Sequence, residues 1–262
     1  MDFSELVAIV REPNTPSGAH ESIRQICTAV PMAKVQRILD VGSNTGFATL
    51  EFASLLDAEV VGIDINEESK CFAEARAKAT GLENANFVLG NILELPFEDG
   101  SFDMVYCNNV TSFIADRERA IFEYRRVLRP GGFISMVPLY YITEPPKAMV
   151  DEVSFAINAP VVARGIDQWL EALELANLLP YYRSDFAFDH LEASRISEYA
   201  AQVVSVARLN HLSSDELEQA KDRLTYFFDL FERNLRYCGF SVLIYRLSPV
   251  NDFDVLHTWY ER

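Results

Sequence analysis

The chain has 262 residues, 49% of them hydrophobic, and a formal net charge of -16. This size supports one substantial core, so we expect a single domain with additions rather than two domains. The excess of acidic residues argues against a nucleic-acid partner, because phosphate binding needs a basic surface, and no apolar run approaches membrane-spanning length. Four widely spaced cysteines without a CxxC pair or a histidine partner predict neither a metal site nor a disulfide framework. The acidic N-terminus favours a cytoplasmic location.

Residues 1–36 predict a pair of helices that precede the first buried strand. A first helix with Phe3 and Leu6 on one face is followed by the breaker-rich segment 13–18 and then by a second helix. The simplest role for this pair is to cover an edge of the sheet. His20 follows the breaker segment and is a candidate proton acceptor, although a lone histidine is more often a polar residue at a helix N-terminus.

The segment 37–53 predicts a buried strand, a tight loop and a helix in direct succession. The apolar run Ile38–Val41 is interrupted only by Asp40, and Gly42 and Gly46 then bracket the loop. Glycine has no Cβ, so the backbone of such a loop can approach a ligand closely. Because the helix begins directly after the loop, the loop amides lie at a helix N-terminus, as a nucleotide-type cofactor site requires.

The spacing of the loop glycines selects among such cofactors. A dinucleotide site needs GxGxxG, and Asn44 stands where the second glycine of that fingerprint would be. A P-loop needs a lysine after its last glycine, and none follows Gly46. The loop is therefore suited to a ligand that has no phosphate to cradle.

A second apolar strand at 60–63 ends in Asp64, about twenty residues after the first strand. In Rossmann-like folds an acid in this region meets ribose hydroxyls, and a carboxylate can accept two hydrogen bonds from a cis-diol. The alternative is that Asp64 caps the next helix, although Asn66 already serves as that cap. The arrangement favours an adenosine-containing ligand.

The rest of the predicted core alternates helices and strands. Helices are predicted at 66–81 and 116–128, and strands at 86–89, 104–107 and 133–137. Asn91 and Ile92 follow the first of these strands, and Asn108 and Asn109 follow the second. Ligands of open α/β sheets bind at the carboxyl ends of strands, although turn chemistry explains Asn108 and Asn109 equally well.

Three strings of this sequence resemble the class I S-adenosylmethionine (SAM)-dependent methyltransferases of the small-molecule, type 11-like group. They are LDVGSNTG at 39–46, GNILELPFEDGSFD at 90–103 and RVLRPGGFI at 126–134. The resemblance implies a Rossmann-like α/β fold with a seven-stranded, mostly parallel sheet in the order 3-2-1-4-5-7-6, helices on both faces and an antiparallel last strand. It is specific over residues 37–140, the SAM-binding core, and architectural beyond them.

The same resemblance implies that SAM is the cofactor. The residues it implies as cofactor-binding are Asp40, Gly42, Ser43, Asn44, Gly46, Asp64, Ile65, Asn91, Ile92 and Asn108. Many relatives carry aspartate at the position of Asn91, but an amide oxygen can also accept a hydrogen bond from the adenine amine. The Asp/Asn-Pro-Pro-Tyr/Phe signature of amine-specific enzymes is absent. Relatives often close helices that precede the core over SAM and substrate, so residues 1–36 are also interpreted as a lid.

Residues 141–262 are interpreted as the acceptor-side half of the domain. They predict two amphipathic helices, a strand at 181–188, a long helix that begins with the capping box Ser213 and Glu216, and a last strand at 239–247. The helical segment at about 190–237 is longer than a hairpin needs. It is therefore predicted to be a helical cap inserted before the last strand, or a subunit contact such as a homodimer would use.

Tyr140 and Tyr141 follow the fifth strand at the edge of the sheet where a methyl group would be presented. A tyrosine offers an apolar body and a hydroxyl that can orient an acceptor, so both are candidate catalytic residues, although a packed tyrosine pair is the alternative.

The hypothesis drawn from the sequence is methyl transfer from SAM to a small, partly apolar or aromatic metabolite, which leaves S-adenosylhomocysteine (SAH). Two alternatives remain open. The chain could be a SAM-binding partner subunit without catalysis, since a fold does not fix a function, or it could perform SAM-dependent chemistry without net methylation.

Overall fold

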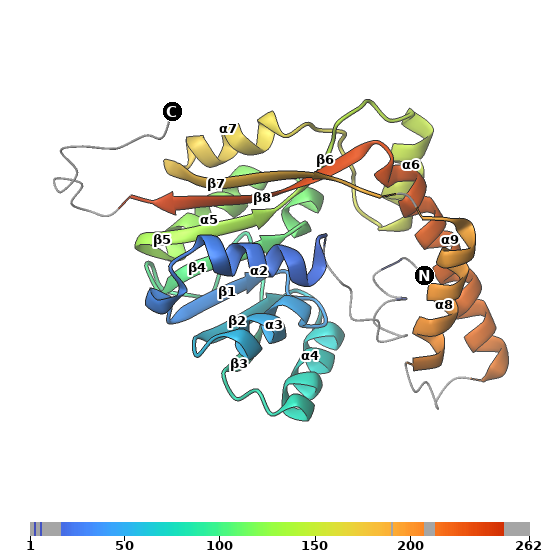
Figure 1. Cartoon of the computed structure of the whole chain (residues 1–262), viewed down its shortest axis with the longest axis horizontal. Coiled ribbons are helices and arrows are strands. Elements are labelled where there is room, and N and C mark those ends of the chain that lie inside the picture. Colours follow the sequence, from blue (N-terminus) through green and yellow to red (C-terminus); the bar gives the residue numbers. More distant parts are fainter. Residues whose placement is uncertain (1–2, 4–5, 7–16, 190, 207–212, 249–262) are drawn as a thin grey trace.

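The structure of the protein is a computed structural model that describes residues 3, 6, 17–189, 191–206 and 213–248. A central sheet of eight strands lies between helices (Figure 1). The strands are β1 (Arg37–Val41), β2 (Glu59–Asp64), β3 (Ala85–Leu89), β4 (Phe102–Asn108), β5 (Leu128–Val137), β6 (Leu139–Tyr141), β7 (Leu178–Ala187) and β8 (Cys238–Leu247). The helices are α2 (Ala19–Ala29), α3 (Phe47–Leu55), α4 (Glu67–Thr80), α5 (Arg117–Val127), α6 (Lys147–Ala156), α7 (Asp167–Leu175), α8 (Ala193–Val206) and α9 (Ser214–Leu235).

The strand order confirms the predicted sheet. Strands β3, β2, β1, β4 and β5 follow one another in parallel, and β8 is antiparallel to β5. Strand β7 pairs along β8, as the sixth strand of the expected order should. There is one more strand than predicted, because the fifth strand is broken at Pro138, which has no backbone N–H to donate to a ladder. The short β6 resumes after the proline and also pairs with β8.

The two faces of the sheet are covered by different helices because successive strand residues point to opposite sides. Ile38 is buried in a cluster with residues of α2 and α3, whereas its neighbour Leu39 is buried in a cluster with residues of α5 and α7. Each such side chain stabilises the fold by roughly 1.5–3 kcal/mol when it is fully buried. The predicted arrangement of helices on both faces is thus confirmed.

Helix boundaries agree with the capping signals. Asn66 accepts hydrogen bonds from the amides of Glu68 and Ser69 at the start of α4, and Ser213 and Glu216 form the predicted capping box of α9. The fifth strand starts earlier than predicted, since β5 already includes the RPGG segment. Gly131 there has φ of 80°.

Helices α6, α8 and α9 form a separate apolar cluster, to which Leu6 also belongs. Figure 1 shows α8 and α9 beyond the carboxyl ends of the parallel strands. Phe3 packs edge-on against Phe231 of α9, with ring centroids 4.8 Å apart. The remainder of the predicted first helix lies outside the described residues. None of the described helices combines the length and apolar character that crossing a bilayer requires.

Candidate functional site

A cavity of about 770 Å³ lies where the carboxyl ends of β1, β2 and β4 face the helices α6 to α9. One half is lined by the loop after β1 and by the ends of β2 and β4, and the other half by β6 and the surrounding helices. The polar residues of the first half are Asp40, Ser43, Asn44, Asp64, Asn66 and Asn108, and the aromatic residues of the second are Phe3, Tyr140, Tyr141, Trp169, Tyr199, Phe228 and Phe231. The lining thus contains most of the predicted cofactor residues, including Gly42 and Ile65.

The loop after β1 turns sharply because three of its residues have left-handed backbone angles. Gly42, Asn44 and Gly46 have φ of 70°, 46° and 81°. The amides of Gly42 and Ser43 both donate to the carbonyl of Ile63, at 2.8 and 3.0 Å. The loop is therefore tied to the end of β2, and α3 begins directly after it.

The structure adds a second reason for the two loop glycines. The approach of a ligand to their backbone stays a prediction, and protein side chains also occupy the space that a side chain at either position would need. A Cβ on Gly42 would lie 2.6 Å from Cβ of Val110, and one on Gly46 would lie 2.8 Å from Cζ of Phe87. Internal packing and positive φ together require glycine at both positions.

Asp64 holds the loop as well as facing the cavity. One carboxylate oxygen accepts from the amide of Asn44 at 2.8 Å, and the other accepts from the amide of Asn66 at 2.9 Å. An ionised carboxylate offers about four acceptor positions, so Asp64 can still accept from ligand hydroxyls. The neighbouring Ile65 lines the cavity with a side chain that is 75% exposed.

Asp40 is a buried acid at the floor of the same half. Its carboxylate accepts a hydrogen bond of 2.6 Å from Oγ1 of Thr49. The pKa of Asp40 is raised from 3.8 to about 7, mainly because burial strips its charge of hydration and also because of the nearby charge of Asp64, while the hydrogen bonds from Thr49 oppose the rise. The cavity thus contains an acid that titrates near neutrality.

Asn108 supplies an unused acceptor. Its side-chain amide donates to the hydroxyl of Tyr106 at 3.0 Å, while its Oδ1 is buried without a hydrogen-bond partner among the described residues. A buried acceptor of this kind is costly unless a ligand satisfies it. Together with the carboxylates of Asp40 and Asp64, this acceptor fits a ligand that carries hydroxyls and an amine, as SAM does.

Four predicted residues lie away from this group. Gly46 is not among the described residues that line the cavity, and a Cβ on it would face Phe87 and Ala73. Asn91 is exposed, and its Oδ1 accepts from the amide of Leu93 at 2.9 Å, while Ile92 is buried in the core beneath α5. The ring of His20 lies 2.8 Å from the carboxylate of Glu51. None of Asn91, Ile92 and His20 is among the described residues that line the cavity. Their roles stay predictions.

Both candidate tyrosines line the cavity, and both hydroxyls have protein partners. The hydroxyl of Tyr140 lies 2.9 Å from Oγ of Ser241, which in turn donates to Asp185 at 2.6 Å. The hydroxyl of Tyr141 donates to Oδ1 of Asn234 in α9 at 2.9 Å. These bonds fix the orientation of both rings at the border of the aromatic half.

Sequence reasoning missed two arginines of the lining, Arg117 and Arg164. Arg117 is the first residue of α5, and Arg164 precedes α7. Neither belongs to a motif. The acid at position 116 that caps α5 was the sole local signal, and it indicates a helix start rather than a site.

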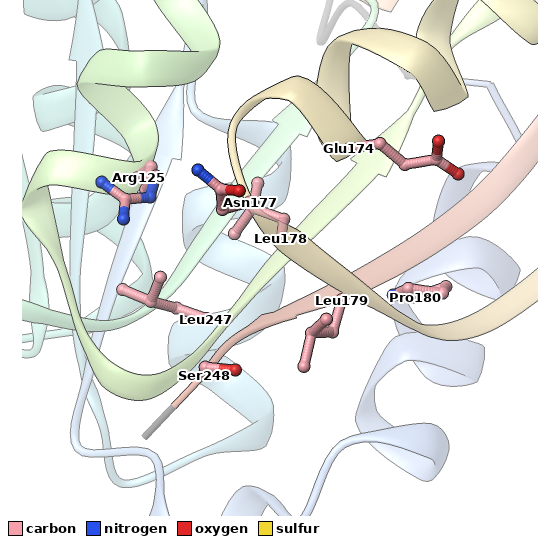
Figure 2. Close-up of a pocket in the computed structure, with 8 residues that line it drawn as sticks. All are labelled: Arg125, Glu174, Asn177, Leu178, Leu179, Pro180, Leu247 and Ser248. Atoms are coloured by element: carbon pink, nitrogen blue, oxygen red, sulfur yellow. The ribbon is translucent and has the colours of Figure 1, made fainter. Parts of the chain in front are cut away.

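A second cavity of about 690 Å³ lies at the opposite edge of the sheet, between the start of β7 and the end of β8 (Figure 2). Figure 2 shows Arg125 and Glu174 on different sides of Asn177, so the two charged side chains do not converge. The described residues that line this cavity therefore do not bring charged side chains together into a reactive site.

Comparison with known proteins agrees with this geometry. Residues 39–136 match a family model described as a methyltransferase domain. The O-methyltransferase rstn1 of Aspergillus nomiae is 30% identical over 131 residues, which are 50% of this chain and 58% of that protein. The 27-O-demethylrifamycin SV methyltransferase of Amycolatopsis mediterranei is 30% identical over 159 residues, which are 60% of this chain and 58% of that protein. The chain therefore matches a little over half the length of these relatives.

Among solved structures, the MccD protein is similar to this chain, with a TM-score of 0.73 at 21% identity. The match covers 90% of this chain and 100% of that one. At this identity the similarity shows a shared fold.

Proposed function

We propose that this chain, whose residues 39–136 belong to the class I SAM-dependent methyltransferases, transfers the methyl group of SAM to a small-molecule acceptor bound in the 770 Å³ cavity. The observation that carries the proposal is the division of this one cavity into a polar half at the loop after β1 and an aromatic half at helices α6 to α9. Ligand pockets range over roughly 300–1,000 Å³, so the cavity is large enough for a small-molecule site.

The polar half supplies the groups that would hold the cofactor. Asp64 would accept the ribose hydroxyls, and the unpartnered Oδ1 of Asn108, with the carboxylate of Asp40, would receive the amine of the methionyl part. When bound, SAM supplies an electrophilic methyl group on a sulfonium. The residues of this half therefore act by binding and orientation.

The aromatic half would hold the acceptor. Its rings exclude water and offer apolar surface, and aromatic faces also attract a cation such as a sulfonium. Tyr140 and Tyr141 line this half, and their hydroxyls are held by Ser241 and Asn234. Catalysis would rest mainly on proximity and orientation, which can contribute several kcal/mol of barrier lowering.

The name of one relative supports a small-molecule acceptor. The protein of Amycolatopsis mediterranei is a methyltransferase named for 27-O-demethylrifamycin SV, a small molecule. The net charge of -16 on this chain also disfavours nucleic acid as the acceptor.

The test is incubation of the protein with SAM labelled on its methyl group and an extract of small metabolites. The expected result is a labelled small molecule formed in equal amount with SAH, and less of both with Asp64→Ala. Turnover of an extract component without label transfer would favour SAM-dependent chemistry without net methylation. SAM binding without any turnover would favour a non-catalytic partner subunit.

A further inference from the structure

The acceptor half contains two guanidinium groups that no carboxylate of the described residues neutralises. Arg117 and Arg164 both line the cavity, and neither forms a salt bridge with a described residue. The chain has 39 acidic residues against 23 lysines and arginines, so acidic partners are abundant elsewhere. Among the described lining residues the carboxylates are those of Asp40 and Asp64, which belong to the polar half.

Arg117 is held in place by contacts that leave part of its guanidinium free. Its Nε donates to the carbonyl of Thr111 at 3.2 Å, and its Nη2 donates to the carbonyl of Ser112 at 2.7 Å. Its guanidinium also lies 4.7 Å from the ring centroid of Trp169. Because a guanidinium has five N–H groups, about three remain for a ligand.

Arg164 is positioned through its backbone. Its carbonyl accepts from the amide of Tyr141 at 2.8 Å, which places it beside β6. Its side chain forms no hydrogen bond or ion pair with any described residue. Within the described part of the chain its N–H groups are therefore available to a ligand in the cavity.

The two guanidiniums also affect each other. The pKa of Arg117 is lowered to about 10 by burial and by the positive charge of Arg164. Two like charges therefore line one half of the cavity without a counter-ion among the described residues. An anion between them would remove this repulsion and complete the hydrogen bonds of both groups.

We propose that the acceptor carries an oxyanion group, a carboxylate or a phosphate, which Arg117 and Arg164 bind together while the aromatic half holds the apolar body. The forked guanidinium matches the oxygens of both groups with paired hydrogen bonds. This inference rests on the proposed function, since it concerns the acceptor of that same cavity. It narrows the acceptor to a small apolar or aromatic acid or phosphate ester.

The test uses benzoate and phenyl phosphate as probes, with benzamide as the neutral match of benzoate. Each probe is titrated into the full chain by calorimetry, with and without saturating SAH. The variants are Arg164→Gln and Arg164→Lys. The control is Arg119→Gln, because Arg119 lies on α5 with Arg117 but is exposed and outside the lining. Arg164 has no side-chain bond to lose within the described protein, so its substitution should leave folding intact.

The expected result is that at least one anionic probe binds and benzamide binds at least about tenfold more weakly, as loss of a charged hydrogen bond predicts. Arg164→Gln should weaken the anion by about tenfold, Arg164→Lys by less, and Arg119→Gln not at all. Whichever of benzoate and phenyl phosphate binds more tightly identifies the oxyanion.

Equal binding of benzoate and benzamide, no binding of either anion, or unchanged anion binding by Arg164→Gln would overturn the inference. The SAH titration separates it from the proposed function. Failure of SAH to bind contradicts the proposed function, whereas SAH binding without anion binding contradicts only the arginine pair.

Discussion

The carboxylate of Asp64 accepts a hydrogen bond of 2.8 Å from the backbone amide of Asn44, so the end of β2 holds the loop that follows β1. Asp64 thereby joins the end of β2 to the loop after β1, and both face the cavity. A change at Asp64 is expected to act on the shape of the loop as well as on any ligand that the carboxylate contacts.

Asp64→Ala should weaken SAM binding by roughly 1–3 kcal/mol, the cost of leaving partners of charged hydrogen bonds unsatisfied. The free energy of unfolding should also fall, because the amides of Asn44 and Asn66 lose their acceptor. Calorimetry with SAM and urea unfolding measure the two effects. The matched control is Glu83→Ala, an exposed acid outside the lining. Unchanged SAM affinity in Asp64→Ala would show that the carboxylate does not contact the cofactor.

Gly42→Ala should destabilise the fold in the absence of any ligand, by about 1–3 kcal/mol, because its Cβ would overlap Val110 and its φ is 70°. Val110→Ala in the same chain removes the two Cγ atoms at 2.7 and 2.8 Å but keeps the Cβ at 2.6 Å, so it should recover only part of the steric loss. A double-mutant cycle on the free energy of unfolding measures that recovered part. Additive effects would contradict the contact. Gly42→Val should be worse still, so its loss of SAM binding would not by itself identify the cofactor loop.

Asp40 should give the protein a pH-dependent stability. The pKa of Asp40 rises from 3.8 to about 7 on folding, so between these pH values the folded chain retains a proton that the unfolded chain has released. The contribution of Asp40 to the free energy of unfolding is therefore complete below pH 4 and is lost as the pH rises to 7. The loss is at most roughly 4 kcal/mol. Urea unfolding of the wild type and Asp40→Asn between pH 4 and 8 measures it, since Asn cannot ionise but can still accept from Thr49. Parallel curves for the two proteins would refute the assignment.

Tyr141→Phe should lower turnover several-fold while SAM affinity stays nearly unchanged, because acceptor positioning is lost and cofactor contacts are not. Tyr140→Phe should behave likewise, although it also removes a buried bond to Ser241. Both are measured with the acceptor found by label transfer. Tyr181→Phe, on β7 and outside the lining, is the control. If both variants turned over at the wild-type rate, the tyrosines would be packing residues.

Much of the fold could be predicted because its signals are local. The cap at Asn66 and the capping box at Ser213 lie within a few residues of what they cap, and the period of apolar residues marked the strands. Features that depend on distant contacts were not predictable. The short strand β6 after Pro138 exists because it pairs with β8, which is distant in the sequence. The contact between Val110 and Gly42 likewise joins residues that are far apart in the chain.

The same distinction holds for the site. The loop, Asp64 and Asn108 follow strands, so their meeting at one sheet edge could be inferred from the order of the elements. Arg117 begins α5, whereas Arg164 is held beside β6 by the amide of Tyr141, so tertiary contacts bring them to one cavity. No local pattern marks such a pair.

The most direct test of the account is a crystal structure of the protein with SAH. We expect the ribose hydroxyls to contact Asp64, the amine of the ligand to contact the Oδ1 of Asn108, and the sulfur to face the aromatic half beside Tyr140 and Tyr141. A ribose away from Asp64, or a sulfur that faces away from the aromatic half, would contradict it.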